Sequence, residues 1–168
     1  MYDDKDRIKV VILGESEVGK SALINRFINN SFDEYAPHSS TASFVSKTID
    51  FNDKFYDFDM WDICGQEKFR SLSKFFLKNA KIAVLVYDIT RKKTFLDLDF
   101  WLKLILDEIG SNIFLILVGN KSDLFENEQI KEKDGIKFAK ALNAKFVLTN
   151  AKYDLSNWSN SFQGALRD

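Results

Sequence analysis

The residues whose types and spacing most clearly suit a chemical role form one short stretch near the N-terminus, Gly14-Glu15-Ser16-Glu17-Val18-Gly19-Lys20-Ser21. The stretch fits the pattern G-x-x-x-x-G-K-S, follows an apolar run and precedes an amphipathic segment. In that context glycines let the backbone wrap an anion, and a helix N-terminus supplies further N–H donors. The pattern predicts a phosphate-binding loop, whereas a turn that binds nothing would not need this strand–loop–helix arrangement.

Two side chains of this phosphate loop, residues 14–21, have specific roles in the chemistry. We expect Lys20 to reach the terminal phosphates and the Ser21 hydroxyl to ligate Mg²⁺. Because backbone N–H groups form the cradle, we expect the Glu17 carboxylate to point to solvent. The predicted nucleotide contacts here are Glu15, Glu17, Val18, Gly19, Lys20, Ser21 and Ala22.

A second group of residues follows an alternating segment that ends at Trp61. Asp62 stands where an acidic residue can hold Mg²⁺ through water, since Mg²⁺ keeps several of its waters. Gly65 can bring a backbone N–H close to a γ-phosphate, and the Gln66 amide can orient an attacking water. With Lys20, these two residues form the predicted catalytic set; a solvated carboxylate at a strand end is the alternative for Asp62.

A third group, Asn120-Lys121-Ser122-Asp123, follows another apolar run and can select a base. The Asp123 carboxylate can accept two hydrogen bonds from the N1–H and 2-amino edge of guanine, which adenine does not offer. Lys121 can lay its aliphatic stem along the purine face. The sequence therefore predicts a guanine nucleotide.

Hydrophobic periodicity predicts the elements that position these groups. Apolar or alternating runs indicate strands, and amphipathic segments indicate helices. Their alternation predicts an α/β fold of three layers: a six-stranded, mostly parallel sheet with one antiparallel edge strand and helices on both faces. The expected strands are 8–13, 44–51, 55–61, 82–87, 113–118 and 145–148, and the expected helices are 20–29, 68–78, 94–109, 130–142 and 155–166.

Composition narrows the class of protein. The 168 residues suit one domain spanning 1–168, and a net charge of −1 with interspersed charges gives no reason to expect nucleic acid as a partner. One Cys and one His exclude a disulfide framework and disfavour zinc. We expect no signal peptide or membrane span, and the last residues contain no Cys for prenylation.

The three groups together resemble the small GTPases of the Ras superfamily, and most closely the Rab family. The likeness extends from Ile8 to about Leu166 and includes Trp61-Asp62, Gly65 to Leu72 and Tyr87-Asp88-Ile89-Thr90. The phosphate loop, which begins Gly-Glu-Ser, resembles that of early-endosomal Rabs. The resemblance implies the Ras-like P-loop GTPase fold, GTP, GDP and Mg²⁺ as ligands, and a molecular switch in vesicle trafficking.

The resemblance also implies further site residues. Phe32 matches the aromatic that covers guanine, and Ser39 matches a threonine that ligates Mg²⁺, with Thr41 as a rival position. Asn120 would tether the base and the phosphate loop, Ala151 would donate its N–H to guanine O6, and Lys152 would line the pocket. Effectors, an exchange factor and a GTPase-activating protein would bind two switch segments, at about 33–44 and 63–77, of a monomer.

Several residues depart from the family pattern and affect the expected rate. Ser39 replaces Thr, Cys64 replaces Ala beside Gly65, and Glu17 adds a carboxylate to the phosphate loop. We therefore expect slow hydrolysis, with a nucleotide-binding interaction module of very weak or no hydrolysis as the alternative. A third class, an ATPase or small-molecule kinase, is disfavoured by Asn120 and Asp123.

Membrane attachment is expected only through a prenylated tail that this chain lacks. A trimmed sequence is the favoured explanation, and a protein without such a tail is the other. We expect a cytoplasmic protein that, when prenylated at full length, lies on the cytoplasmic face of endosome-like membranes.

Overall fold

A computed structural model describes residues 7–37, 42–153 and 157–167. These residues form one six-stranded sheet with the strand order β2-β3-β1-β4-β5-β6. β2 pairs antiparallel with β3 at one edge, and all other neighbours are parallel. The predicted fold class is confirmed. The strands are β1 (Arg7–Gly14), β2 (Ser43–Phe51), β3 (Lys54–Asp62), β4 (Ile82–Asp88), β5 (Phe114–Asn120) and β6 (Lys145–Leu148).

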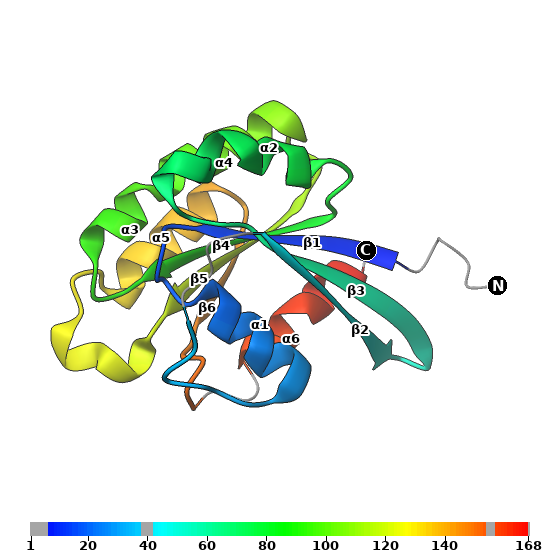
Figure 1. Cartoon of the computed structure of the whole chain (residues 1–168), viewed down its shortest axis with the longest axis horizontal. Helices are drawn as coiled ribbons and strands as arrows, with labels where there is room; N and C mark the ends of the chain where they lie inside the picture. Colours follow the sequence, from blue (N-terminus) through cyan, green and yellow to red (C-terminus); the bar gives the residue numbers. More distant parts are fainter. Residues whose placement is uncertain (1–6, 38–41, 154–156, 168) are drawn as a thin grey trace.

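Helices cover both faces of the sheet (Figure 1). α1 and α6 lie below the sheet in this view, and α2, α3, α4 and α5 lie above it. The helices are α1 (Lys20–Asn29), α2 (Arg70–Leu77), α3 (Lys92–Leu96), α4 (Leu98–Glu108), α5 (Glu132–Ala141) and α6 (Asn157–Asn160). Three 3₁₀ segments complete the described elements: η2 (Glu67–Phe69), η3 (Ser122–Asn127) and η4 (Ser161–Leu166).

The central strand β1 shows why a continuous apolar run forms a buried strand here. Val10 and Ile12 pack into the core on the α1 side, while Val11 and Leu13 pack into the core under α4. Side chains alternate between the faces of a strand, so a strand covered on both sides needs apolar residues at every position. β1 ends at Gly14, which puts the phosphate loop at the carboxyl edge of the sheet.

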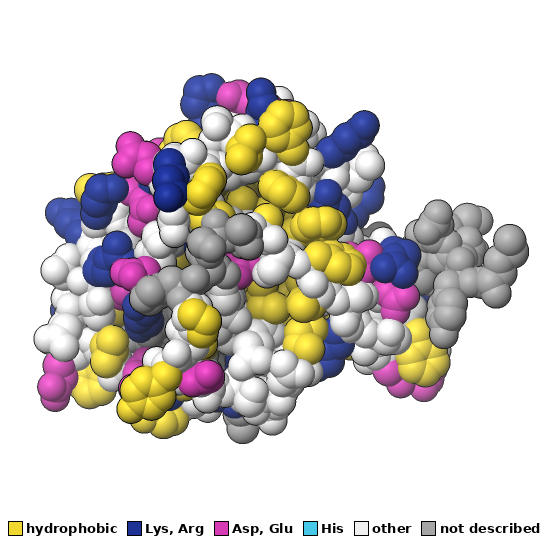
Figure 2. Space-filling model, in the orientation of Figure 1, with side chains coloured by type: hydrophobic (Ala, Val, Ile, Leu, Met, Phe, Trp, Pro, Cys, Tyr) yellow, Lys and Arg dark blue, Asp and Glu magenta, His cyan; other side chains and the backbone are white. Residues whose placement is uncertain are grey.

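Charged side chains of both signs are interspersed over the face seen in Figure 2, and hydrophobic side chains gather between α2 and the β2–β3 pair. Phe44, Leu72 and Phe75 are among the exposed residues of that region. In the part of the chain that the structure describes, no helix is long and apolar enough to cross a membrane.

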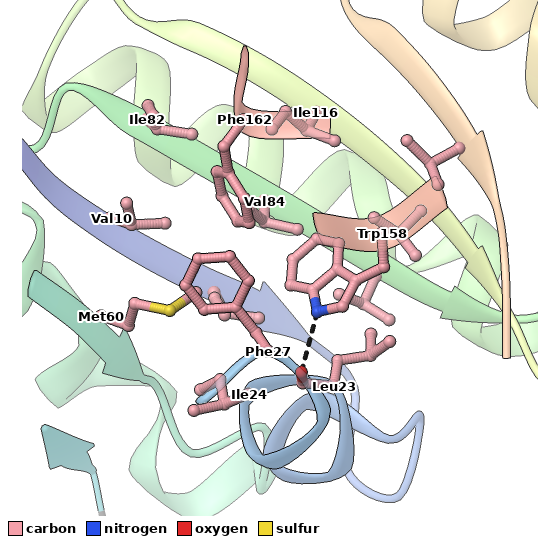
Figure 3. Packing of buried hydrophobic residues seen from close by; sticks show 14 of the residues in the cluster. Val10, Leu23, Ile24, Phe27, Met60, Ile82, Val84, Ile116, Trp158 and Phe162 are labelled. Atoms are coloured by element: carbon pink, nitrogen blue, oxygen red, sulfur yellow. Dashed lines mark hydrogen bonds between the residues drawn. The ribbon is translucent and has the colours of Figure 1, made fainter. Parts of the chain in front are cut away.

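Aromatic side chains fill the core between α1, the sheet and the C-terminal segment (Figure 3). Phe27 lies with its ring centroid 5.0 Å from Phe162 and 6.4 Å from Trp158. The Trp158 indole N–H donates to the Leu23 carbonyl at 2.8 Å, drawn as the dashed line in Figure 3. A buried indole usually finds such a partner, and this one joins the end of the chain to α1.

The helix predicted over 94–109 is divided, which corrects the sequence-based expectation. α3 ends at Leu96 and α4 begins at Leu98, with Asp97 between them at ψ −9°. Asp is unfavourable in a helix interior, because its side chain hydrogen-bonds to nearby backbone groups in non-helical conformations, and it favours helix caps. Here its carboxylate pairs with Lys93 at 2.6 Å, and the Phe100 N–H donates to its carbonyl at 3.1 Å. The apolar periodicity continues across this break, so periodicity did not reveal it.

The helix predicted over 155–166 is also shorter than expected. α6 spans four residues, Asn157–Asn160, and the chain continues as the 3₁₀ segment η4. The Ser161 hydroxyl donates to the Trp158 carbonyl at 2.6 Å, an acceptor that a continuing helix would use for a backbone N–H. Leu155 lies outside the described residues.

Candidate functional site

A cavity of about 350 Å³ opens at the carboxyl edge of the sheet, where the phosphate loop, α1 and the end of β3 meet. Its volume suits a small ligand such as a nucleotide. Several of the predicted residues line it together. They are Glu17, Gly19, Lys20, Ser21, Ala22, Phe32, Asp62, Gly65 and Lys121.

Lys20 is held at the base of this cavity by the phosphate loop. Its Nζ donates to the carbonyls of Gly14 at 3.1 Å and Glu15 at 3.0 Å. Burial lowers the pKa of the Lys20 ammonium, and the nearby carboxylates of Asp62 and Glu15 oppose that shift. A buried ammonium among carbonyl oxygens is positioned to meet phosphate oxygens that enter the loop.

Ser21 and Asp62 lie side by side on the cavity wall, although they are 41 residues apart in sequence. The Ser21 hydroxyl donates to Asp62 Oδ2. β3 pairs in parallel with β1, and Asp62 stands opposite Ile12 in that register. The sheet therefore delivers the carboxylate to the start of α1, where Ser21 lies.

Gly65 lies directly against the phosphate loop. A Cβ at this position would be 2.4 Å from the Gly14 carbonyl oxygen and 2.6 Å from the Ser16 nitrogen. Backbone atoms cannot move aside as a flexible side chain can, so glycine is required for this close approach. The approach brings the Gly65 backbone to the mouth of the predicted phosphate cradle.

Asn120 joins the predicted base-selecting segment to the phosphate loop. Its Nδ2 donates to the Val18 carbonyl at 2.8 Å from a side chain that is 2% exposed. Gly19 makes room for it, because a Cβ on Gly19 would be 2.3 Å from Asn120 Nδ2. Gly19 also has φ +100°, which glycine adopts without steric cost, and it caps the N-terminus of α1.

Lys121 strengthens the same junction. Its Nζ donates to the Glu17 carbonyl at 2.9 Å and pairs with Asp88 Oδ2 at 2.8 Å. Burial raises the pKa of Asp88, but hydrogen bonds from Lys121 and Thr90 more than offset this, so its pKa lies below the usual value. The Glu17 side chain is exposed, in agreement with the expected orientation.

The chain matches the Ras family model over residues 9–168, which is nearly its whole length. The chain belongs to the Ras family. The Ras-related protein Rab-22A of Homo sapiens is 37% identical to it over 145 residues, which cover 86% of this chain and 75% of that protein. The chain is thus a Rab-type small GTPase, a class that acts in membrane trafficking.

The remaining predicted residues of this GTPase either do not line the cavity or lie outside the residues that the structure describes. Asp123 is the second residue of η3, two positions after Lys121, and Ala151 and Lys152 follow β6. Gln66 precedes η2 and is half-buried. Along the described residues, none of these four lines the cavity. Ser39 and its rival Thr41 lie outside the described residues.

The oxygen donors of the GTPase suit Mg²⁺. A serine hydroxyl and a carboxylate in direct contact are hard ligands, and Mg²⁺ completes its shell with waters and phosphate oxygens. Over the described ranges, 7–37, 42–153 and 157–167, no group of three or more His, Cys, Asp or Glu side chains could hold a metal. Ser21 and Asp62 thus supply two oxygen donors of the kind that Mg²⁺ prefers.

Three arginines of the site were not assigned roles from the sequence. Arg91 Nη1 donates to the Ser16 carbonyl at 3.1 Å, and Arg70 pairs with the Glu15 carboxylate. The guanidinium of Arg26 is bonded to the carbonyls of Ala151 and Lys152. The Glu15 side chain thus faces Arg70, and its carbonyl is what contacts Lys20. No local pattern marks these contacts, because each joins segments far apart in the chain.

Proposed function

We propose that this small GTPase binds GTP and GDP with Mg²⁺ and acts as a molecular switch in vesicle trafficking, hydrolysing GTP slowly. One observation carries the proposal. The Lys20, Ser21 and Asp62 side chains share a cavity with Lys121, and the Asn120 amide fastens the base-selecting segment to the phosphate loop at 2.8 Å. The groups that would bind a phosphate and a metal ion are thereby connected to the segment that would select guanine.

In this proposal the phosphate loop and Lys20 bind the phosphates. Mg²⁺, held by Ser21, Asp62 and Ser39, would neutralise charge on the β- and γ-phosphates. Gly65 would donate its N–H to the γ-phosphate, and Gln66 would orient the attacking water. Lys20 would stabilise the negative charge that develops as the terminal phosphate leaves.

Guanine would be selected beside the cavity, next to the side of its lining that Lys121 forms. The Asp123 carboxylate would accept hydrogen bonds from N1–H and the 2-amino group, and the Ala151 N–H would donate to O6. Phe32 and the Lys121 stem would cover the two faces of the base, and Lys152 would line its edge. Glu15, Glu17, Val18, Gly19 and Ala22 would contribute the backbone around the phosphates.

Partners would bind the face formed by residues 33–44 and 63–77. Phe44 is 46% exposed and its ring lies 4.9 Å from Trp61, which lies 5.7 Å from Phe76. These side chains come from β2, β3 and α2, and Figure 2 shows hydrophobic side chains gathered between these elements. An effector, an exchange factor and a GTPase-activating protein would recognise this face on a monomer at the cytoplasmic side of an endosome-like membrane, reached through a prenylated tail.

The test of nucleotide identity is mass analysis of the ligand that co-purifies with the protein, followed by competition. GTP and GDP are expected to displace a labelled GDP, and ATP is not. Displacement by ATP at a comparable concentration would revive the ATPase or kinase class.

A second candidate, an interaction module that binds nucleotide and barely hydrolyses it, is favoured by Cys64. This residue is buried beside Gly65 where family members have the smaller alanine. Single-turnover hydrolysis with and without a GTPase-activating protein separates the two. A slow basal rate that the activator raises supports the switch, and no turnover in either case supports the module.

A further inference from the structure

The guanidinium of Arg26 donates to three backbone carbonyls in two separate segments of the chain. Nε donates to the Ala151 carbonyl at 2.8 Å, Nη2 donates to the Lys152 carbonyl at 2.6 Å, and Nη1 donates to the Asn30 carbonyl at 3.0 Å. Arg26 lies in the last turn of α1, and Ala151 is 125 residues away in sequence.

This arrangement is specific to arginine. The residue is 9% exposed, and burying a charge is costly unless hydrogen bonds satisfy it. A planar guanidinium can address two adjacent carbonyls in a fixed geometry, whereas the lysine ammonium is a single point of contact. The fork therefore fixes the positions of both carbonyls and the peptide between them.

The segment that Arg26 holds is the base loop, residues 149–153. Its first residue is hydrogen-bonded to β5, since the Thr149 N–H donates to the Gly119 carbonyl at 2.9 Å. The chain beyond the loop returns to α1 through Trp158, whose indole donates to the Leu23 carbonyl (Figure 3). Arg26 contacts the stretch between these two anchors.

We infer that Arg26 is a positioning residue for guanine recognition. It fixes the base loop against α1, the helix that begins with Lys20 and Ser21, so that the Ala151 N–H faces O6 of the bound base. The inference rests on the proposed binding of guanine nucleotides. Arg26 touches neither base nor phosphate in this role and acts through the Ala151–Lys152 backbone.

The base loop is also joined to the first switch segment. Lys152 Nζ pairs with Glu34 Oε1 at 3.3 Å, while Arg26 holds the Lys152 carbonyl. A loop that moves after loss of Arg26 would therefore weaken the base contact first and this exposed pair second.

The test uses three diphosphates that differ at the purine. GDP carries O6, N1–H and the 2-amino group. IDP keeps O6 and N1–H and lacks the amino group. 2-Aminopurine riboside diphosphate keeps the amino group and lacks both O6 and N1–H. Dissociation constants are measured with Mg²⁺ for the wild type, Arg26→Met, Arg26→Lys and the control Arg7→Met. Arg7 pairs with Asp59 at the opposite end of β1.

Arg26→Met is expected to weaken the binding of GDP and of IDP by the same factor, about tenfold. This factor corresponds to the free energy of one hydrogen bond between neutral groups. The 2-aminopurine analogue is expected to lose less than about twofold, because the O6 contact is absent from it. Arg26→Lys restores one carbonyl contact, so it should show the same ligand pattern with a smaller loss. Arg7→Met should bind all three as the wild type does.

An equal loss for all three ligands would overturn the inference, since it would indicate a general structural defect. Unchanged GDP binding in Arg26→Lys and Arg26→Met would overturn it as well. If Arg26→Met does not fold, the ligand pattern of Arg26→Lys decides alone. Failure of the wild type to prefer GDP over ADP would instead refute the proposed guanine site before any variant is compared.

Discussion

At the scale of single residues, Cys64 has the most direct bearing on rate. It is 7% exposed and lines both the nucleotide cavity and a neighbouring apolar pocket of about 180 Å³ bounded by Phe69 and Leu72. Its neighbour Gly65 already touches the phosphate loop. In the proposed function, a thiol larger than a methyl group at this junction would limit how the second switch segment meets a γ-phosphate.

Cys64→Ala is therefore expected to raise the single-turnover rate of GTP hydrolysis by about threefold. The removed sulfur leaves a small cavity, so stability should fall by about 1 kcal/mol. Ser73→Ala is a matched control, because Ser73 is buried and lines the apolar pocket but not the nucleotide cavity. An unchanged rate in Cys64→Ala would refute the steric argument.

The Asp88–Lys121 pair gives a pH-dependent prediction. The folded pKa of Asp88 lies below its ordinary 3.8, so its contribution to stability is complete above that value and is lost as pH falls through the folded pKa. Asp88→Asn should cost about 2 kcal/mol at pH 7. In urea unfolding the gap from wild type should narrow as the pH falls below about 4; a gap that is constant or widens in acid would contradict this assignment.

Candidate site residues can be recognised in the sequence where they lie close together along the chain. The spacing of their residue types identifies the phosphate loop and the segment from Asn120 to Asp123. The structure brings Lys20, Ser21, Asp62 and Lys121 to one cavity. The partners of Arg26 and Arg70 are 125 and 55 residues away. Such contacts are created by the fold, and the type of an isolated arginine does not specify its acceptor.

At the scale of elements, α2 is attached to the phosphate loop through Arg70. Its guanidinium pairs with Glu15, lies 3.7 Å from Asp97 and stacks 4.8 Å from the Phe100 ring centroid. The Lys93 ammonium also approaches Glu15, at 3.7 Å. One helix start, one loop and the break between α3 and α4 are thus joined by a single network.

Arg70→Met is expected to destabilise the protein by about 2 kcal/mol and to speed amide hydrogen exchange in α2, because Glu15 would lose its charged partner in a largely buried place. Glu15→Gln should have a similar effect. The double variant should cost less than the sum of the two, and strict additivity would show that the pair is not coupled.

Element types followed from sequence more reliably than their ends did. The six strands lie where apolar or alternating runs predicted them, because a strand shows its apolar side chains on each face that is covered. The break at Asp97 and the 3₁₀ form of η4 depend on hydrogen bonds of Asp97 and Ser161. Those bonds exist only once neighbouring elements are in place, so hydrophobic periodicity does not contain them.

At the scale of the whole molecule, ligand binding should appear as stability. A nucleotide at one hundred times its dissociation constant adds about 2.7 kcal/mol, which corresponds to a Tm increase of about 5 to 10 °C for a domain of this size. Thermal unfolding with GDP and Mg²⁺ measures it. Chelation of Mg²⁺ should reduce the increase, and an equal increase with ADP would contradict guanine selection.

The place of β1 in the middle of the sheet has a consequence for synthesis on the ribosome. Val10 pairs with Met60 on one side and with Ile82 on the other. β1 therefore leaves the ribosome before either of the two strands that pair with it. Pairing over such separations is slow, and an apolar strand with open edges can associate with other chains meanwhile. The nascent protein therefore has the greatest need of a chaperone before β4 has left the ribosome tunnel.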